Sequence, residues 1–339
     1  MDSIKFSFII PAYNAEKTIK RTLDSIACRM DCYEAIVVEN GSTDNTTAVV
    51  EDLIRSNSKI KLIHSDKGVS KARNEGIKQA SGEWISFVDA DDEWIGSQKE
   101  VSNVLTGKET PDIVAFAYEK GKKTITHYYI ETEDAVSGED LVEVTARMLA
   151  KPTLWMQVWA KLYRREFLLE NDLQLDTRLR LSEDSEFLIR CLLSSKKVLI
   201  SDLPVYRYCT DAPSTMRSID SHRTEGYIMS LETIKEDVAD ADRRIASSFT
   251  DYALTQINLI CVHDIFNCDM KASWKKRIEK TKEVVNQPGI SAEISKVDHK
   301  RLKDIHSLPA FFFKHGMISA GGLICYARSL MNKRAYKHQ

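Results

Sequence analysis

The sequence predicts an α/β protein with an open, doubly wound and mostly parallel sheet, followed by a helical carboxyl-terminal region. Short β-rich runs alternate with helical patterns over the first hundred residues. These runs are apolar throughout, which is typical of a parallel sheet covered on both faces. Beyond about residue 216 the pattern changes to long helices. With 43% hydrophobic residues, the 339-residue chain can fill a sizeable core.

Four runs are predicted as strands, Phe6–Ile10, Ala35–Val38, Ile60–His64 and Trp84–Val88. Apolar residues at helical spacing lie between the first two runs, as Ile19, Leu23 and Ile26 show. The polar segments "PAYNAE", "ENGSTDNT", "DKGVSKARNEG" and "DADDEW" follow the four strands in order. Because sheets of this kind bind ligands at the carboxyl ends of their strands, we expect these segments to form a binding site.

Each polar segment also has a purely structural interpretation. Pro11 and Asn14 suffice to end a strand and begin a helix, and residues 41–44 suffice for a turn. Four such segments in succession favour a phosphate-bearing ligand, met by helix amino termini, hydroxyls and Arg73. The sequence has neither GxGxxG nor GxxxxGK[ST], so a dinucleotide fingerprint or a P-loop does not explain the site.

Charge and cysteine content exclude several classes of function. A formal net charge of −2 and a pI near 6.5 provide no basic field, so we expect no nucleic-acid partner. Seven cysteines without a CxxC pair argue against a disulfide framework and a structural zinc site. The amino terminus resembles a first strand rather than an export signal, so we expect a cytoplasmic protein.

The run "WISFVDADDEW" places Asp89, Asp91 and Asp92 directly after an apolar strand. Carboxylates this close repel one another unless a cation lies between them and a phosphate, and oxygen ligands suit Mg²⁺ or Mn²⁺. A cation on a diphosphate would stabilise the charge that collects on this leaving group. The alternative is a solvated acidic loop.

Five segments together resemble a known family. "FSFIIPAYNAEKTIKRTLDSI", "IVVENGSTDNT", "GVSKARNEGIKQASGEWISFVDADD", "WAKLYRREFL" and "SEDSEFLIR" are similar, in this order, to the motifs of family 2 glycosyltransferases. These are inverting enzymes with the GT-A fold that use nucleotide sugars. The resemblance covers roughly residues 4–210. It implies the same fold and chemistry here but leaves the donor sugar and the acceptor open.

The resemblance also implies roles for individual residues. Pro11, Tyr13 and Glu39 would flank the nucleobase, and Arg73 would lie near the nucleotide. The sequence departs from the family at Glu39 and Asn40, where paired aspartates are usual. Glu39 has a longer reach to the imino hydrogen of the base, so base selectivity stays open.

At the acidic run, the resemblance assigns Asp91 as the main protein ligand of the cation and places Asp89 in the ribose or metal region. The role of Asp92 stays open between support of the metal through water and ordering of the turn.

The run "RLSEDSEFLIRC" offers a candidate for the base that an inverting displacement needs. Ser182 is predicted to cap a helix whose first turn carries Glu183 and Asp184, and the helix dipole favours ionised acids there. By resemblance Asp184 is the base, and Glu183 orients or replaces it. Acids are also common in first turns for structural reasons alone.

The run "WMQVWAKLYRREFL" brings Trp155, Trp159, Lys161 and Tyr163 together. Aromatic faces beside a cation suit a sugar or its phosphate, and the family has a similar segment on the acceptor side, which assigns Trp159 and Lys161 there. Core packing explains the tryptophans nearly as well. Arg207 is a weaker candidate near the donor phosphates.

The region 216–339 reads as a helical appendage to a catalytic domain of residues 1–215. From Ile305 onward it has no acidic residue, and its apolar clusters are accompanied by Lys314, Arg328, Lys333, Arg334 and Lys337. The apolar run is too short to span a bilayer, so two interpretations remain, a helix on an anionic membrane surface or packing onto the catalytic domain.

These observations predict a metal-dependent inverting glycosyltransferase that takes a sugar from a nucleoside diphosphate. UDP is the nucleotide we expect. The acceptor would be a hydroxyl of a glycan or lipid-linked glycan, and family analogy suggests bacterial polysaccharide synthesis. Two alternatives are a non-catalytic carbohydrate-binding protein that keeps the fold, and a nucleotidyltransferase that attacks phosphorus.

Overall fold

The structure is a computed structural model that describes residues 5–107, 109–126, 135–210, 223–298 and 307–337. One compact unit comprises Met1–Thr145 and Met156–Ser218, and a second comprises Ala146–Trp155 and Ile219–Gln339. The domain boundary expected after residue 215 lies outside the described residues.

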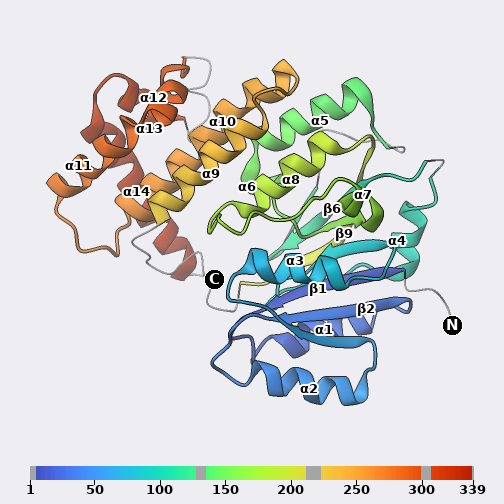
Figure 1. The fold of residues 1–339 in the computed structure, drawn as a ribbon. Helices are drawn as coiled ribbons and strands as arrows, with labels where there is room; N and C mark the ends of the chain where they lie inside the picture. Colours follow the sequence, from blue (N-terminus) through green and yellow to red (C-terminus); the bar gives the residue numbers. More distant parts are fainter. Residues whose placement is uncertain (1–4, 108, 127–134, 211–222, 299–306, 338–339) are drawn as a thin grey trace. The chain divides into compact units, whose positions relative to one another are not determined.

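The predicted parallel strands are present as β1 (Phe6–Ala12), β2 (Tyr33–Glu39), β3 (Ile60–His64) and β4 (Trp84–Phe87). They lie parallel in the order β3-β2-β1-β4. Figure 1 shows β1 and β2 side by side. All residues of β1, β2 and β4 are buried, as their apolar sequences predicted. β1 runs past the predicted end to Ala12, and Pro11 is tolerated because the ladder with β4 ends at Ile9.

The sheet continues beyond β4 with strands of both directions. These are β5 (Glu93–Trp94), β6 (Ile113–Lys120), β7 (Lys123–Ile125), β8 (Lys161–Arg164) and β9 (Val198–Tyr208). β8 is antiparallel to β4 and β6, whereas β9 is parallel to β6. The described strands form one sheet in the order β3-β2-β1-β4-β8-β6-β9-β5, with β7 on β6.

Helices cover both faces of the parallel part. The first unit contains α1 (Ile19–Ala27), α2 (Thr46–Ser56), α3 (Val69–Gln79), α4 (Gln98–Val104), α7 (Arg165–Glu170) and α8 (Glu183–Ser194). On one face of β1, Phe8 and Ile10 share a core with residues of α1. On the opposite face, Gly76 of α3 lies against Ile9. The doubly wound α/β arrangement is therefore confirmed.

The strand order predicts a ligand site at one edge of the sheet. The chain runs outward from β1 through β2 to β3 and returns to pair β4 on the other side of β1. Ligands of open α/β sheets bind at the carboxyl ends of the strands where the order reverses in this way. The segments after β1, β2 and β4 meet at this edge.

The second unit is helical, as predicted. Its described helices include α9 (Arg223–Asp237), α10 (Arg243–Leu259), a π-helix (Ile260–Ile265), α11 (Trp274–Val285), α12 (Pro288–Ser295), α13 (Leu308–Lys314) and α14 (Ile318–Lys337). Helix α5 (Gly138–Ala150) runs from the first unit into the second, and the short α6 (Pro152–Trp155) follows it.

The basic carboxyl-terminal segment packs within this helical unit. α13 and α14 contact each other, α13 contacts α10 and α12, and α14 contacts α11 and the π-helix. Gly321 and Gly322 lie against Phe313 and Phe266 so closely that a Cβ at either position would clash. None of the described helices is both long and apolar enough to cross a bilayer.

The close approach of α3 to β1 yields a stability prediction. A Cβ on Gly76 would lie 2.3 Å from Cγ2 of Ile9. We expect Gly76→Ala to lower the free energy of unfolding by about 1 to 3 kcal/mol because overpacking displaces the helix. Urea denaturation measures this effect. The matched control is Gly289→Ala, because a Cβ added at Gly289 would meet no neighbouring atom within 4 Å. Equal urea midpoints of unfolding for the two variants would contradict the expectation.

Candidate active site

The backbone of the acidic turn after β4 is fixed by α1. The buried hydroxyl of Thr22 lies 3.0 Å from the carbonyl oxygen of Ala90 and 2.7 Å from that of Asp92. Arg21 donates from Nη2 to the carbonyl oxygen of Asp91 at 2.5 Å. These three contacts hold the backbone of the turn in place.

Asp92 turns into the protein. Its carboxylate accepts hydrogen bonds from the Tyr206 hydroxyl at 2.6 Å and from the Cys209 backbone nitrogen at 2.7 Å. Burial raises the pKa of Asp92 to about 8, and the nearby Asp89 adds to this rise. The Asp89 nitrogen lies 3.3 Å from the same Tyr206 hydroxyl. These contacts tie the turn to the end of β9, so Asp92 orders the turn.

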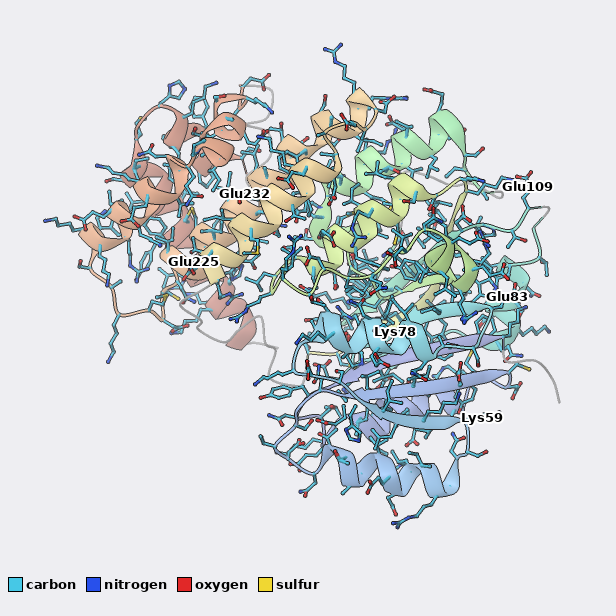
Figure 2. The ribbon with its side chains drawn as sticks, in the orientation of Figure 1. Lys59, Lys78, Glu83, Glu109, Glu225 and Glu232 are labelled. Atoms are coloured by element: carbon cyan, nitrogen blue, oxygen red, sulfur yellow. The ribbon has the colours of Figure 1, made fainter. Side chains whose placement is uncertain are left out.

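Arg73 connects the two acidic motifs. Its side chain is 4% exposed, and Nη2 contacts Asp89 Oδ1 at 3.0 Å while Nη1 contacts Asp184 Oδ1 at 2.6 Å. Glu183 Oε1 lies 3.5 Å from the same Nη1. Lys78, later on α3, is instead exposed (Figure 2). The inward face of α3 thus places one cation among three carboxylates from the two predicted acidic runs.

The candidate base lies at the first turn of α8. Ser182 precedes the helix with a left-handed φ of 59° and makes no side-chain capping hydrogen bond, so the predicted cap is wrong. Burial raises the pKa of Glu183 to about 7, with a further rise from Asp184 that Arg73 opposes. At Glu183, burial therefore outweighs the helix dipole that was expected to favour the ionised acid.

The second oxygen of Asp184 is held much less tightly than the first. Oδ2 lies 3.5 Å from the Val158 backbone nitrogen, at the limit of a hydrogen bond. Oδ1 carries the short contact with Arg73. The less constrained oxygen, Oδ2, is thus the better placed to accept a proton.

The loops after β1 and β2 are joined to each other. Asn14 Oδ1 accepts from the Thr43 nitrogen at 2.8 Å, and the Asn14 nitrogen donates to Ser42 Oγ at 3.0 Å. The Ala15 nitrogen donates to Thr46 Oγ1 at 2.8 Å. Asn14 has a φ of 51°, which an asparagine tolerates. The joined loops therefore form one wall at the carboxyl ends of β1 and β2.

Tyr13 and Glu39 lie on this wall. Tyr13 is 41% exposed, with Lys67 Nζ 4.6 Å from its ring centroid and 3.1 Å from its hydroxyl. Pro11, by contrast, is buried within β1. An exposed aromatic ring beside a cation leaves a face on which a nucleobase can stack.

The Glu39 carboxylate organises its own loop. It accepts hydrogen bonds from the backbone nitrogens of Gly41, at 2.8 Å, and Ser42. Its other oxygen lies 3.2 Å from His64 Nδ1, on the neighbouring strand. Burial alone would raise the pKa of Glu39, but these hydrogen bonds outweigh it and lower the pKa.

Trp159 and Lys161 differ in accessibility. Trp159 is half-buried and stacks on Tyr206, with ring centroids 4.5 Å apart. Lys161 is buried, and its ammonium donates to the carbonyl oxygens of Gln157 at 2.7 Å and Trp159 at 3.4 Å. Burial lowers the pKa of Lys161 to about 7, although Asp184 opposes this shift. Lys161 is thus held inside the domain by backbone carbonyl oxygens, whereas Trp159 keeps part of its ring accessible.

Several contributors to the site were not found from the sequence. Thr22 and Tyr206 fix the acidic turn, yet each looks like an ordinary core residue in its own segment. Arg207, the weaker phosphate candidate, pairs with Glu119 at 2.9 Å and Glu93 at 2.8 Å. The joint role of Arg73 has no sequence signal, because its partners are distant in the chain.

The described residues contain no group of three His, Cys, Asp or Glu side chains that could hold a metal by themselves. Asp89 is paired with Arg73, and Asp92 points inward. Asp91 is half-buried on the turn between them. Mg²⁺ is commonly held by one or two carboxylates together with substrate phosphates and water, so this donor set fits a cation that arrives with a diphosphate.

Comparison with known proteins shows which proteins this chain resembles. The model of glycosyl transferase family 2 matches residues 7–168. The uncharacterized glycosyltransferase EpsJ of Bacillus subtilis is 29% identical over 63% of this chain and 63% of its own length. The poly(ribitol-phosphate) beta-N-acetylglucosaminyltransferase TarS of Staphylococcus aureus is 26% identical over 87% of this chain. That match spans 51% of TarS, so the chain covers less than two thirds of either relative.

Solved structures support the fold. The crystal structure of S. aureus TarS 1–349 in complex with UDP-GlcNAc has a TM-score of 0.67 with this chain at 21% identity. The match covers 97% of this chain and 92% of that one. The predicted GT-A fold with a helical carboxyl-terminal region is confirmed, and residues 7–168 are similar to glycosyl transferase family 2.

Proposed function

We propose that this protein is an inverting glycosyltransferase that moves a sugar from a UDP-sugar to a hydroxyl of a glycan or lipid-linked glycan in polysaccharide synthesis. The observation that carries the proposal is the cluster at the strand ends, where Arg73 joins Asp89 of the acidic turn to Asp184 of α8. The acidic turn suits the leaving diphosphate, and Asp184 of α8 suits the attacking hydroxyl.

The named relatives support the donor and acceptor classes. TarS carries the name of a poly(ribitol-phosphate) beta-N-acetylglucosaminyltransferase and has been crystallised with UDP-GlcNAc. WfgD of Escherichia coli, 39% identical over 30% of this chain and 40% of its own, is named a UDP-Glc:alpha-D-GlcNAc-diphosphoundecaprenol beta-1,3-glucosyltransferase. These relatives are all named as glycosyltransferases, which favours transfer over the carbohydrate-binding and nucleotidyltransferase alternatives.

In the proposed reaction, the acceptor hydroxyl attacks the anomeric carbon as the bond to the diphosphate breaks. Asp184 accepts the hydroxyl proton, and its less constrained Oδ2 is the oxygen we assign to this task. Tyr13 and Glu39 flank the nucleobase, with Pro11 supporting the loop from β1. Trp159 offers a partly exposed aromatic face on the acceptor side.

We expect Asp184→Asn to lower kcat by about 10² to 10⁴-fold while donor affinity stays unchanged, because the base acts on the acceptor. Glu183→Gln should reduce kcat less. UDP release from UDP-glucose or UDP-N-acetylglucosamine measures turnover, and calorimetry with UDP measures affinity. A larger loss of kcat in Glu183→Gln than in Asp184→Asn would identify Glu183, instead of Asp184, as the base.

We further propose that Asp91 holds Mn²⁺ or Mg²⁺ against the diphosphate, with Asp89 close by. When bound, the cation would stabilise the negative charge that develops on the departing diphosphate. α1 contributes by fixing the turn, because Arg21 and Thr22 hold the carbonyl oxygens around Asp91.

Asp91→Asn should abolish the metal-dependent part of UDP binding without unfolding the protein, because one anionic ligand is lost at a half-buried position. Calorimetry of UDP with and without Mn²⁺ tests this expectation, and circular dichroism controls for the fold. The matched control is Asp24→Asn, an exposed carboxylate on α1 whose partner is Lys20. Wild-type affinity and activity in Asp91→Asn would refute the assignment.

We also propose a cytoplasmic protein that attaches to the anionic membrane surface through α14. The apolar side chains Met317, Leu323, Leu330 and Met331 are between 38% and 66% exposed, and the chain has no acidic residue from Ile305 onward. A basic helix with an exposed apolar stripe binds an anionic interface. The apolar contact with the membrane would come from these exposed side chains and not from Phe313 of the "FFF" cluster, because Phe313 is buried in the helical unit.

Replacing Leu323, Leu330 and Met331 by Gln should release the protein from anionic vesicles, because the apolar area available for the interface is lost. Co-sedimentation with phosphatidylglycerol vesicles measures attachment. The control replaces Leu169 and Met229, exposed to similar degrees elsewhere. Point variants are preferable to truncation after Lys303, which would remove Phe313 and Cys325 from the core. Equal pelleting of variant and wild type would eliminate this surface.

A further inference from the structure

We propose that Arg73 and Asn74 of α3 are positioning residues that together place the segment carrying Asp184, Arg73 through the Asp184 carboxylate and Asn74 through the backbone of Leu175. This inference rests on the proposed function, since it assigns a task to residues around the proposed base. It differs from the expectation that Arg73 lies near the nucleotide as a donor contact.

Asn74 holds the start of this segment. Its side-chain nitrogen donates to the Leu175 carbonyl oxygen at 2.8 Å, and its side-chain oxygen accepts from the Leu175 nitrogen at 2.8 Å. Both contacts are buried. A side-chain amide that pairs with both polar groups of one backbone residue fixes that residue in position and orientation.

Arg73 holds the end of the segment. Nη1 contacts Asp184 Oδ1 at 2.6 Å, while Nη2 of the same planar group contacts Asp89 Oδ1 at 3.0 Å. A guanidinium has a fixed fork of donors, so the two carboxylates cannot move independently. Asp184 is therefore set relative to the acidic turn, where the departing diphosphate would lie.

The helix that presents both residues is itself fixed. Gly76 allows α3 to approach β1 so closely that any side chain there would meet Ile9. Arg73, Asn74 and Gly76 are all buried on this helix. The segment from Leu175 to Asp184 is thus attached at both ends to an element that packs directly on the sheet.

The charge balance also favours positioning over donor binding. The cation of Arg73 already faces Asp89, Asp184 and Glu183. A buried cation with several carboxylate partners has little attraction left for a phosphate, and leaving these carboxylates to reach one would leave buried charges unpaired. Arg73 Nε is buried without a hydrogen-bond partner, so the group is oriented by its two terminal nitrogens.

The test uses Arg73→Lys and Asn74→Ala in the full chain. Lysine keeps the charge but cannot bridge two carboxylates, and a displaced base lowers the rate steeply, so we expect kcat to fall about 100-fold in Arg73→Lys. Asn74 contacts neither acid. We therefore expect Asn74→Ala to lower kcat as well, but by less than Arg73→Lys does. Both variants should bind UDP in the presence of Mn²⁺ with wild-type affinity, as calorimetry measures.

A double-mutant cycle with Asp184→Asn distinguishes a role of Arg73 in positioning Asp184 from a role in contacting the donor. If Arg73 acts through Asp184, Arg73→Lys should cause little further loss of kcat in the Asp184→Asn background. Arg164→Lys is the control for an arginine–carboxylate pair outside the cluster, since Arg164 contacts Asp112 at 2.6 Å. It should keep wild-type kcat.

Three results would overturn the inference. They are a loss of UDP affinity in Arg73→Lys that matches its loss of turnover, additive effects in the cycle, or wild-type kcat in a folded Asn74→Ala. Failure of the proposed function has a different signature. In that case the wild-type protein itself would release no UDP from UDP-glucose or UDP-N-acetylglucosamine, while UDP binding of the variants could still be compared.

Discussion

The site depends on one buried cation. Arg73 lies inside the first unit with Asp89, Glu183 and Asp184 around it, and a guanidinium at this depth is stable only with such partners. Although burial alone would lower the pKa of Arg73, these carboxylates raise it. In turn, the acids can lie this close together because the cation is between them. Removing either side would leave unpaired charge in the interior.

The fold supplies what this interaction needs. The order β3-β2-β1-β4 brings the segments after β1, β2 and β4 to one edge, and α3 packs on the face of β1 opposite to α1. α1 fixes the acidic turn through Thr22, and β9 fixes it through Tyr206. The turn is held by α1 and β9, whereas Asp184 is carried by α8, and Arg73 lies between Asp184 and the turn. In the proposed reaction, this arrangement would place the leaving diphosphate and the attacking hydroxyl on the two sides of Arg73.

Local patterns predicted the fold and the acidic motifs because both depend on nearby residues. Apolar runs such as Phe6–Ile10 identify buried parallel strands without any tertiary information. The acids around Asp89 stand out because they follow an apolar segment, and those around Asp184 because they precede one. Contacts between distant segments could not be predicted in this way. Arg73 is 111 positions from Asp184, and the burial of Lys161 depends on the packing of the whole unit. The prediction that the Ser182 side chain caps α8 was wrong, and the backbone of Ser182 is left-handed.

The most direct test of the account is a crystal structure of the protein with UDP and Mn²⁺. The account predicts that the cation contacts Asp91 and the diphosphate, while the Arg73 guanidinium keeps its contacts with both Asp89 and Asp184. A structure in which Arg73 leaves Asp184 and binds the phosphates would contradict it, because the two acidic motifs would then no longer be joined when the donor is bound.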